Sequence, residues 1–180
     1  MSISVFSIGM LFSCSNSKQD IERITFTEDF PDETTKEATI YYSDSAKIKA
    51  ILKAPVIDRY TATADPYNEF PEGIDVVFYN DSGTVENTIT SNYAKHMVEQ
   101  KWMEAQTNVI VTNKDGDQLN TEQLIWDQAK QTIFSEEFVK ITTKEEIIYG
   151  DGFESNENFT QYRIKHIKGI ISVEEDESVQ

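Results

Sequence analysis

The stretch AKIKAILKAPV, residues 46–56, decides the fold class because its side chains alternate in character. The apolar residues share one parity: Ile48, Ala50, Leu52, Ala54 and Val56. The other parity carries Lys47, Lys49 and Lys53. Successive side chains of a β-strand point to opposite faces of a sheet, so this period of two predicts a strand with one dry and one wet face.

Strand and turn signals of the same kind continue along the chain. Residues 74–79 alternate and end at the turn residues 80–83, which predicts a hairpin into residues 84–91. A second hairpin is predicted around the Asp-Gly turn at 113–116, because Asp-Gly is a strong two-residue hairpin signal. Further strands are expected toward the C-terminus: 131–134, 138–142, 147–149 and 162–171.

Helical periodicity is weak, and its best candidate is residues 93–103. Turns recur about every 8 to 12 residues, which is typical of a sandwich, jelly roll or barrel. We therefore expect an all-β fold of two antiparallel sheets. The pattern leaves open whether the space between the sheets is packed or kept open for a ligand.

Charge excludes one class of partner. The chain of 180 residues carries 32 Asp plus Glu against 16 Lys plus Arg, a formal charge of -16. A field of this sign repels polyanions, so nucleic acid is not an expected partner.

The N-terminus contains a lipidation signal. Residues 3–12 form an apolar run that is too short to span a bilayer core of about 30 Å but suits a secretory leader. The sequence Leu11-Phe12-Ser13-Cys14 resembles a bacterial lipobox, in which the cysteine is acylated and becomes the mature N-terminus. The alternative is that Cys14 is an ordinary thiol in a frayed terminus.

The expected organisation has four parts. Residues 1–13 would be a lipoprotein-type signal segment, 14–37 a flexible tether, 38–173 the β-domain, and 174–180 an acidic tail.

Residue patterns for catalysis or metal binding are weak, and no cofactor, metal or enzymatic activity is expected. The adjacent acid pairs, such as Glu136-Glu137, would point to opposite faces of a strand and so cannot act together across a cleft. His96 and His166 have no second ligand at metal-binding spacing. The segment 113–117 resembles the start of a calcium loop, but Gln118 and Leu124 replace its Gly and bidentate Glu, so we interpret it as a hairpin turn.

Five blocks in fixed order carry a family resemblance: residues 41–50, 73–79, 117–126, 134–141 and 149–153. In this order they resemble the LptC family, periplasmic components of the lipopolysaccharide export machine, over about residues 37–173. The resemblance implies a twisted, open β-jelly roll of the OstA/LptA-like type. It also implies that the domain takes lipopolysaccharide from an inner-membrane ABC transporter and passes it to a homologous LptA-like periplasmic jelly roll.

The resemblance also suggests site residues and a location. Candidates to line an apolar groove for the acyl chains are Leu124, Trp126, Phe134, Phe138 and Phe153. Candidates for the edge that meets the downstream partner are Tyr149, Gly150 and Gly152. Familiar members carry an N-terminal transmembrane helix, whereas here an acylated Cys14 would hold the domain at the periplasmic face of the inner membrane.

Two other function classes stay open at this point. A carbohydrate-binding jelly-roll lipoprotein would present aromatic residues such as Trp102 on a solvent-facing platform. A glycosidase would bring two carboxylates to about 5 to 9 Å across a cleft.

Overall fold

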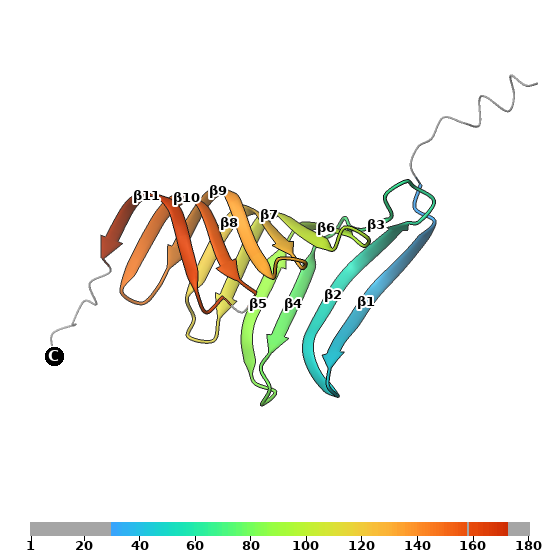
Figure 1. Ribbon diagram of the computed structural model, residues 1–180, viewed down its shortest axis with the longest axis horizontal. Helices are drawn as coiled ribbons and strands as arrows, with labels where there is room; N and C mark the ends of the chain where they lie inside the picture. Colours follow the sequence, from blue (N-terminus) through green and yellow to red (C-terminus); the bar gives the residue numbers. More distant parts are fainter. Residues whose placement is uncertain (1–29, 158, 173–180) are drawn as a thin grey trace, which may run out of the picture. The chain divides into compact units, whose positions relative to one another are not determined.

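The structure, a computed structural model, describes residues 30–157 and 159–172 (Figure 1). Every regular element in these residues is a β-strand, and the strands belong to one compact unit, Pro31–Gln180. The strands are β1 (Glu33–Asp44), β2 (Lys47–Tyr60), β3 (Tyr67–Phe70), β4 (Ile74–Tyr79), β5 (Val85–Ser91), β6 (Tyr93–Met97), β7 (Trp102–Asn113), β8 (Gln118–Asp127), β9 (Thr132–Thr142), β10 (Glu146–Asn156) and β11 (Tyr162–Ser172).

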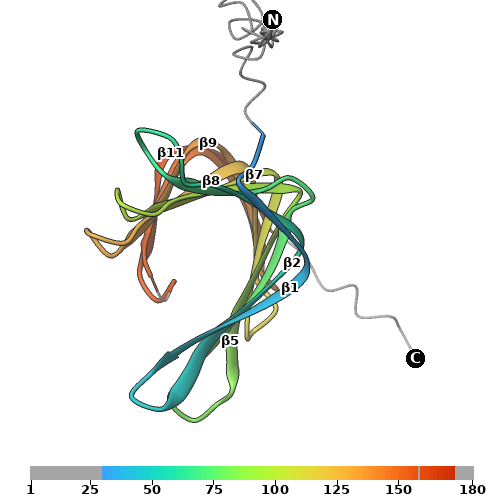
Figure 2. The ribbon, with the colours of Figure 1, turned by 90° about the vertical axis from the view of Figure 1, so that its right-hand side faces the viewer.

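All eleven strands join one antiparallel sheet, which divides into two layers in its N-terminal half. From β7 to β11 each strand pairs with the next in the sequence. Between β2 and β7, however, the strands are connected by two paths of pairing. One path runs through β4 and β5, and the other runs through β3 and β6, which belong to what we call the second layer. The sheet curls so that both layers face a concave side (Figure 2). The expected all-β jelly roll is confirmed, with its two layers formed by one folded sheet.

The layers separate at a corner that Gly73 makes possible. Gly73 has φ 84°, and a Cβ at this position would lie 2.0 Å from the backbone oxygen of Ser91. No side chain fits there, so only glycine allows β3 and β4 to diverge at this point. On the neighbouring strands, Pro55 occupies the corner of β2, and Glu37, with φ 51°, lies opposite it in β1. Proline suits this corner because it has no N–H to donate to a ladder.

The C-terminal strands stay continuous at the same corner and bend there through β-bulges. In β7 the bulge falls between Gln106 and Val109, and related shifts occur in β8, β9 and β10. Buried hydroxyl groups satisfy the backbone there: Thr121 Oγ1 donates to the Phe138 carbonyl at 3.0 Å, and the Glu137 N–H donates to Ser135 Oγ at 3.1 Å. These bonds compensate for the ladder bonds that a bulge interrupts.

Hairpin turns close the strands as the sequence predicts. Asn113 Oδ1 accepts hydrogen bonds from the backbone N–H groups of Asp115 and Asp117, both at 2.9 Å. Asn80 Oδ1 likewise accepts from Ser82 and Thr84, both at 3.0 Å. Such side-chain-to-backbone bonds are typical Asx turns. The interpretation of residues 113–117 as a hairpin turn is confirmed.

Several predicted boundaries were wrong. Residues 93–103 are not helical but contain β6, a turn and the start of β7. The separate strands predicted at 131–134 and 138–142 are one bulged strand, β9. Residues 33–37, expected in the tether, lie in β1 because they pair with β2. The proposed signal segment, Cys14 and the acidic tail lie outside the described residues.

Candidate functional site: an apolar inner face between two edge strands

A row of aliphatic side chains crosses the sheet from one edge to the other. Consecutive members are directly opposite one another in the strand register, and we call this set the inner row: Ile40, Leu52, Val76, Ile89, Val111, Leu119, Ile141, Ile148 and Ile170. Cross-strand neighbours on one face lie about 5 Å apart. The inner row is therefore a continuous apolar stripe that spans nine strands.

Exposure changes along the inner row. The members from Val76 to Ile148 are between 4% and 8% exposed and belong to the hydrophobic core. At the two ends, Ile40 is 44% exposed and Ile170 is 55% exposed. The stripe is covered in its middle and open at both edges of the sheet.

The second layer presents three of the predicted groove residues to the same core. Leu124 is 4% exposed and Phe153 is 2% exposed, and Trp126 packs against this core while partly buried. The indole Nε1 of Trp126 donates to Glu157 Oε1 at 2.7 Å, which satisfies its polar end. We call the side of the sheet that carries the inner row and these three residues the inner face.

The structure does not place the other two predicted groove residues on the inner face. Phe134 lies between Ile133 and Ser135, which are both buried, so its side chain points to the opposite face. Phe138 is 50% exposed and stacks on Tyr149, with ring centroids 6.0 Å apart. A lining role for these two phenylalanines would require a lipid path on the outer face.

Two strands in the described part of the chain have a neighbour on one side only. β1 pairs with β2 alone, and β11 pairs with β10 alone. Of the twelve large hydrophobic residues that are exposed among the described residues, three lie in β1 and four in β11: Ile40, Tyr41, Tyr42, Tyr162, Ile167, Ile170 and Ile171. Unpaired N–H and C=O groups beside apolar side chains make an edge able to pair with another strand.

The predicted partner-edge residues lie one strand inside this edge. Tyr149, Gly150 and Gly152 belong to β10, which is paired on both sides. Gly150 faces Ile167 of β11, and a Cβ on Gly150 would approach Ile164 Cγ2 to 2.4 Å. These glycines allow β11 to pack closely, and the edge itself is β11. Sequence reasoning missed β11 as the edge.

Basic side chains on β11 form ion pairs with acids on β10 and β9. Arg163 lies 2.9 Å from Glu154, Lys168 lies 2.6 Å from Asp151, and Lys165 pairs with Glu136. Arg163 holds the pKa of Glu154 below its usual value, mainly through the side-chain hydrogen bond. Exposed pairs of this kind stabilise little, but charged edge strands resist uncontrolled aggregation.

A histidine of the second layer has its pKa shifted by burial. His96 in β6 faces Met103 of β7 in the register, and burial lowers its pKa. The described residues contain no group of three or more His, Cys, Asp or Glu side chains that could hold a metal ion. They also contain no helix long and apolar enough to cross a membrane.

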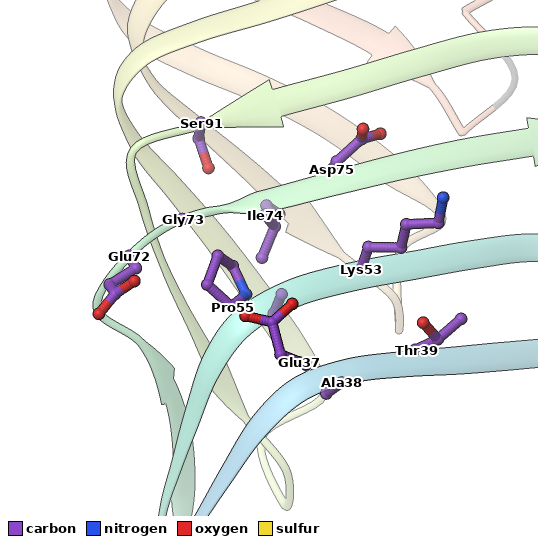
Figure 3. A pocket seen from close by; sticks show the side chains of 11 residues that line it. Glu37, Ala38, Thr39, Lys53, Pro55, Glu72, Gly73, Ile74, Asp75 and Ser91 are labelled. Carbon is purple, nitrogen blue, oxygen red and sulfur yellow. The ribbon is translucent and has the colours of Figure 1, made fainter.

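A cavity of about 360 Å³ lies where the layers diverge (Figure 3). Residues of β1, β2, β4, the turn before β4 and the end of β5 line it, with Pro55, Gly73 and Ile74 at its centre and Glu37, Lys53 and Asp75 around it. Its position follows from the register, because β2 leaves β4 after Lys53 and joins β3 only at Asp58. The cavity is thus a consequence of the corner.

Together, these features define a β-jelly roll with an apolar inner face that is open at two edges, as in a lipid-binding module. The model of one family, described as lipopolysaccharide-assembly, LptC-related, matches residues 5–171. No curated protein matches the chain. The chain belongs to the LptC-related family, and this membership gives it a role in lipopolysaccharide export.

Proposed function

We propose that this protein is a non-enzymatic bridge that carries lipopolysaccharide along its inner face. It would accept the lipid from an inner-membrane ABC transporter and pass it to an LptA-like jelly-roll protein in the periplasm. The observation that carries this proposal is the inner row, which runs without interruption from Ile40 to Ile170 and is exposed at both ends.

The physical need for such a path is large. Each methylene exposed to water costs about 0.8 kcal/mol, so acyl chains that cross an aqueous compartment require continuous apolar cover. Leu124, Trp126 and Phe153 would provide part of that cover from the second layer. We infer that sugars and phosphates stay outside the roll in solvent, because a chain of charge -16 repels phosphate. Protection of the phosphates in a bound complex would contradict this point.

The edges would connect the bridge to its neighbours. Among the described residues, β1 and β11 each have a neighbour on one side only, so a strand of another jelly roll can pair there and extend both the sheet and the inner row. Ile40 and Ile170 would then meet apolar residues of the next protein. An acylated Cys14 would tether the domain to the membrane, and more than one acyl chain gives durable anchoring.

The test uses two neighbouring residues with equal exposure. Ile170 and Ile171 are both 55% exposed, but Ile170 lies opposite Ile148 on the inner face, whereas Ile171 points to the other face. In cells whose only copy carries Ile170→Asp, we expect lipopolysaccharide at the cell surface to fall about tenfold or more, because a carboxylate would interrupt the apolar path. Ile171→Asp should export normally at the same protein level. Equal defects would implicate the edge strand as a whole, and normal export by both variants would refute a path along the inner face.

A further inference from the structure

The closed end of the β1–β2 hairpin is unusually apolar for a surface turn. Tyr41 is 63% exposed, Tyr42 is 64% exposed and Ile48 is 45% exposed. β2 pairs with β4 only through residues 50–53, so the closed end lies beyond the paired residues and beside the end of the β4–β5 hairpin (Figure 2). We call residues 41–49 the hairpin tip.

The apolar residues of the hairpin tip lie on both faces. Tyr41 faces Ile51 in the register and Tyr42 faces Ala50, so the two tyrosines point to opposite sides of the hairpin. A protein that docked on the sheet would cover one of these faces and leave the other in water. A bilayer interface surrounds an inserted tip and covers both. Tyrosine is also enriched at membrane interfaces, where its ring is buried and its hydroxyl group stays hydrated.

The charge of this segment is opposite to that of the chain. Residues 41–49 contain Lys47 and Lys49 against a single acid, Asp44, whereas the whole chain has a formal charge of -16. Lys49 is paired with Asp81 on the β4–β5 hairpin, which holds the two hairpin ends together and leaves Lys47 beside the turn. A basic segment attracts anionic lipid headgroups, while the rest of the molecule is repelled by them.

The turn itself is tightly built. Ser45 and Ala46 have φ values of 52° and 62°, as a two-residue turn with both central residues in the left-handed region requires. Tyr41, Tyr42 and Ile48 are therefore held on regular strands next to a short turn.

We propose that the hairpin tip inserts into the headgroup region of a bilayer that contains anionic phospholipids. This contact is additional to the tether at Cys14 and does not depend on the lipid path along the inner face. It would set the orientation of the jelly roll relative to the membrane.

The test places an environment-sensitive dye on one cysteine at a time. The full-length chain with Cys14→Ser has no other thiol, so Ser45→Cys or Asp115→Cys gives a single labelled position. Asp115 is the matched control because it lies in the β7–β8 turn, which is polar and acidic. With vesicles of phosphatidylglycerol and phosphatidylcholine, we expect a blue shift and quenching by a lipid-borne quencher at position 45 but not at 115.

Three outcomes would overturn the proposal. They are no shift at either position, equal shifts at both positions, and a shift at 45 that is as large with pure phosphatidylcholine. Tyr41→Ser combined with Tyr42→Ser should abolish the shift, and unchanged circular dichroism would show that the variant is folded. Lys47→Ala should weaken vesicle binding about fivefold, whereas Lys114→Ala, at the control turn, should leave it unchanged.

Discussion

The middle of the inner row and its two ends are built from the same kinds of residue but differ in their surroundings. Val111, Leu119 and Ile141 are at most 6% exposed because strands flank them on both sides and the second layer covers them. Ile40 and Ile170 occupy the same row in edge strands and remain about half exposed. Burial in the middle stabilises the fold, whereas exposure at the ends leaves apolar surface available to a lipid or a partner.

The largest difference should separate two phenylalanines. Phe153→Ala removes a ring that is 2% exposed and should cost about 4 kcal/mol of unfolding free energy, because it leaves a cavity in the core. Phe138→Ala removes a ring that is 50% exposed and should cost about 1 kcal/mol. Urea denaturation of the two variants measures both values. Equal losses would show that the outer stack on Tyr149 is as important to the fold as the core.

A similar but smaller difference is expected within the inner row itself. Leu119→Ala should cost about 3 kcal/mol, and Ile170→Ala should cost less than about 1 kcal/mol. Urea midpoints with unchanged slopes would confirm that stability alone has changed. If Ile170→Ala cost as much as Leu119→Ala, the edge would be part of the folding core, and the division between middle and ends would fail.

The corner should depend on one glycine. Gly73→Ala should cost about 2 kcal/mol or more, because its φ of 84° is unfavourable for alanine and its Cβ would collide with the Ser91 oxygen. Gly83→Ala is the matched control: φ is 78°, but nothing lies within 4 Å of its Cβ, so only the backbone cost of about 1 kcal/mol applies. Thermal denaturation compares the two. Equal costs would show that the collision at the corner is relieved without penalty.

The smallest effect should be a dependence of stability on pH through His96. Burial lowers its pKa in the folded state, so below about pH 6.5 the unfolded chain binds a proton that folded His96 does not. Stability should therefore fall as the pH decreases from about 7.5 to about 5.5. His96→Gln should flatten this dependence, whereas His166→Gln, on the exposed edge strand, should retain it. An unchanged slope in His96→Gln would assign the dependence to other groups.

Much of the sheet could be predicted from the sequence because local patterns determine it. The alternation in residues 46–56 and the turns at Asn80 and Asn113 correspond to β2 and to two hairpins. The division of the sheet could not be predicted in this way. A turn at Gly73 normally suggests that the flanking strands pair with each other, but here β3 pairs with β6 and β4 with β5.

Bulges explain why the sequence alone does not show which of the candidate residues face the core. A single extra residue reverses which parity faces the core, and a pattern of alternation does not show where that residue is inserted. The buried parity of β2 changes at the corner, after Pro55. The alternation predicts that Val56 is buried like Ala54, but Ile57 is buried in its place. In β11 the bulge at Lys168 brings Ile167 and Ile170 to the same face. Phe138 follows a similar shift in β9 and lies outside the core.

The most direct test of the lipid path is photocrosslinking in cells with a photoreactive residue at Ile170 or at Ile171. The two positions are adjacent and equally exposed, so they differ only in the face they present. We predict a lipopolysaccharide adduct at position 170 and none at position 171. Adducts of equal yield at both positions, an adduct at 171 alone, or none at either position in a folded protein would contradict transport along the inner face.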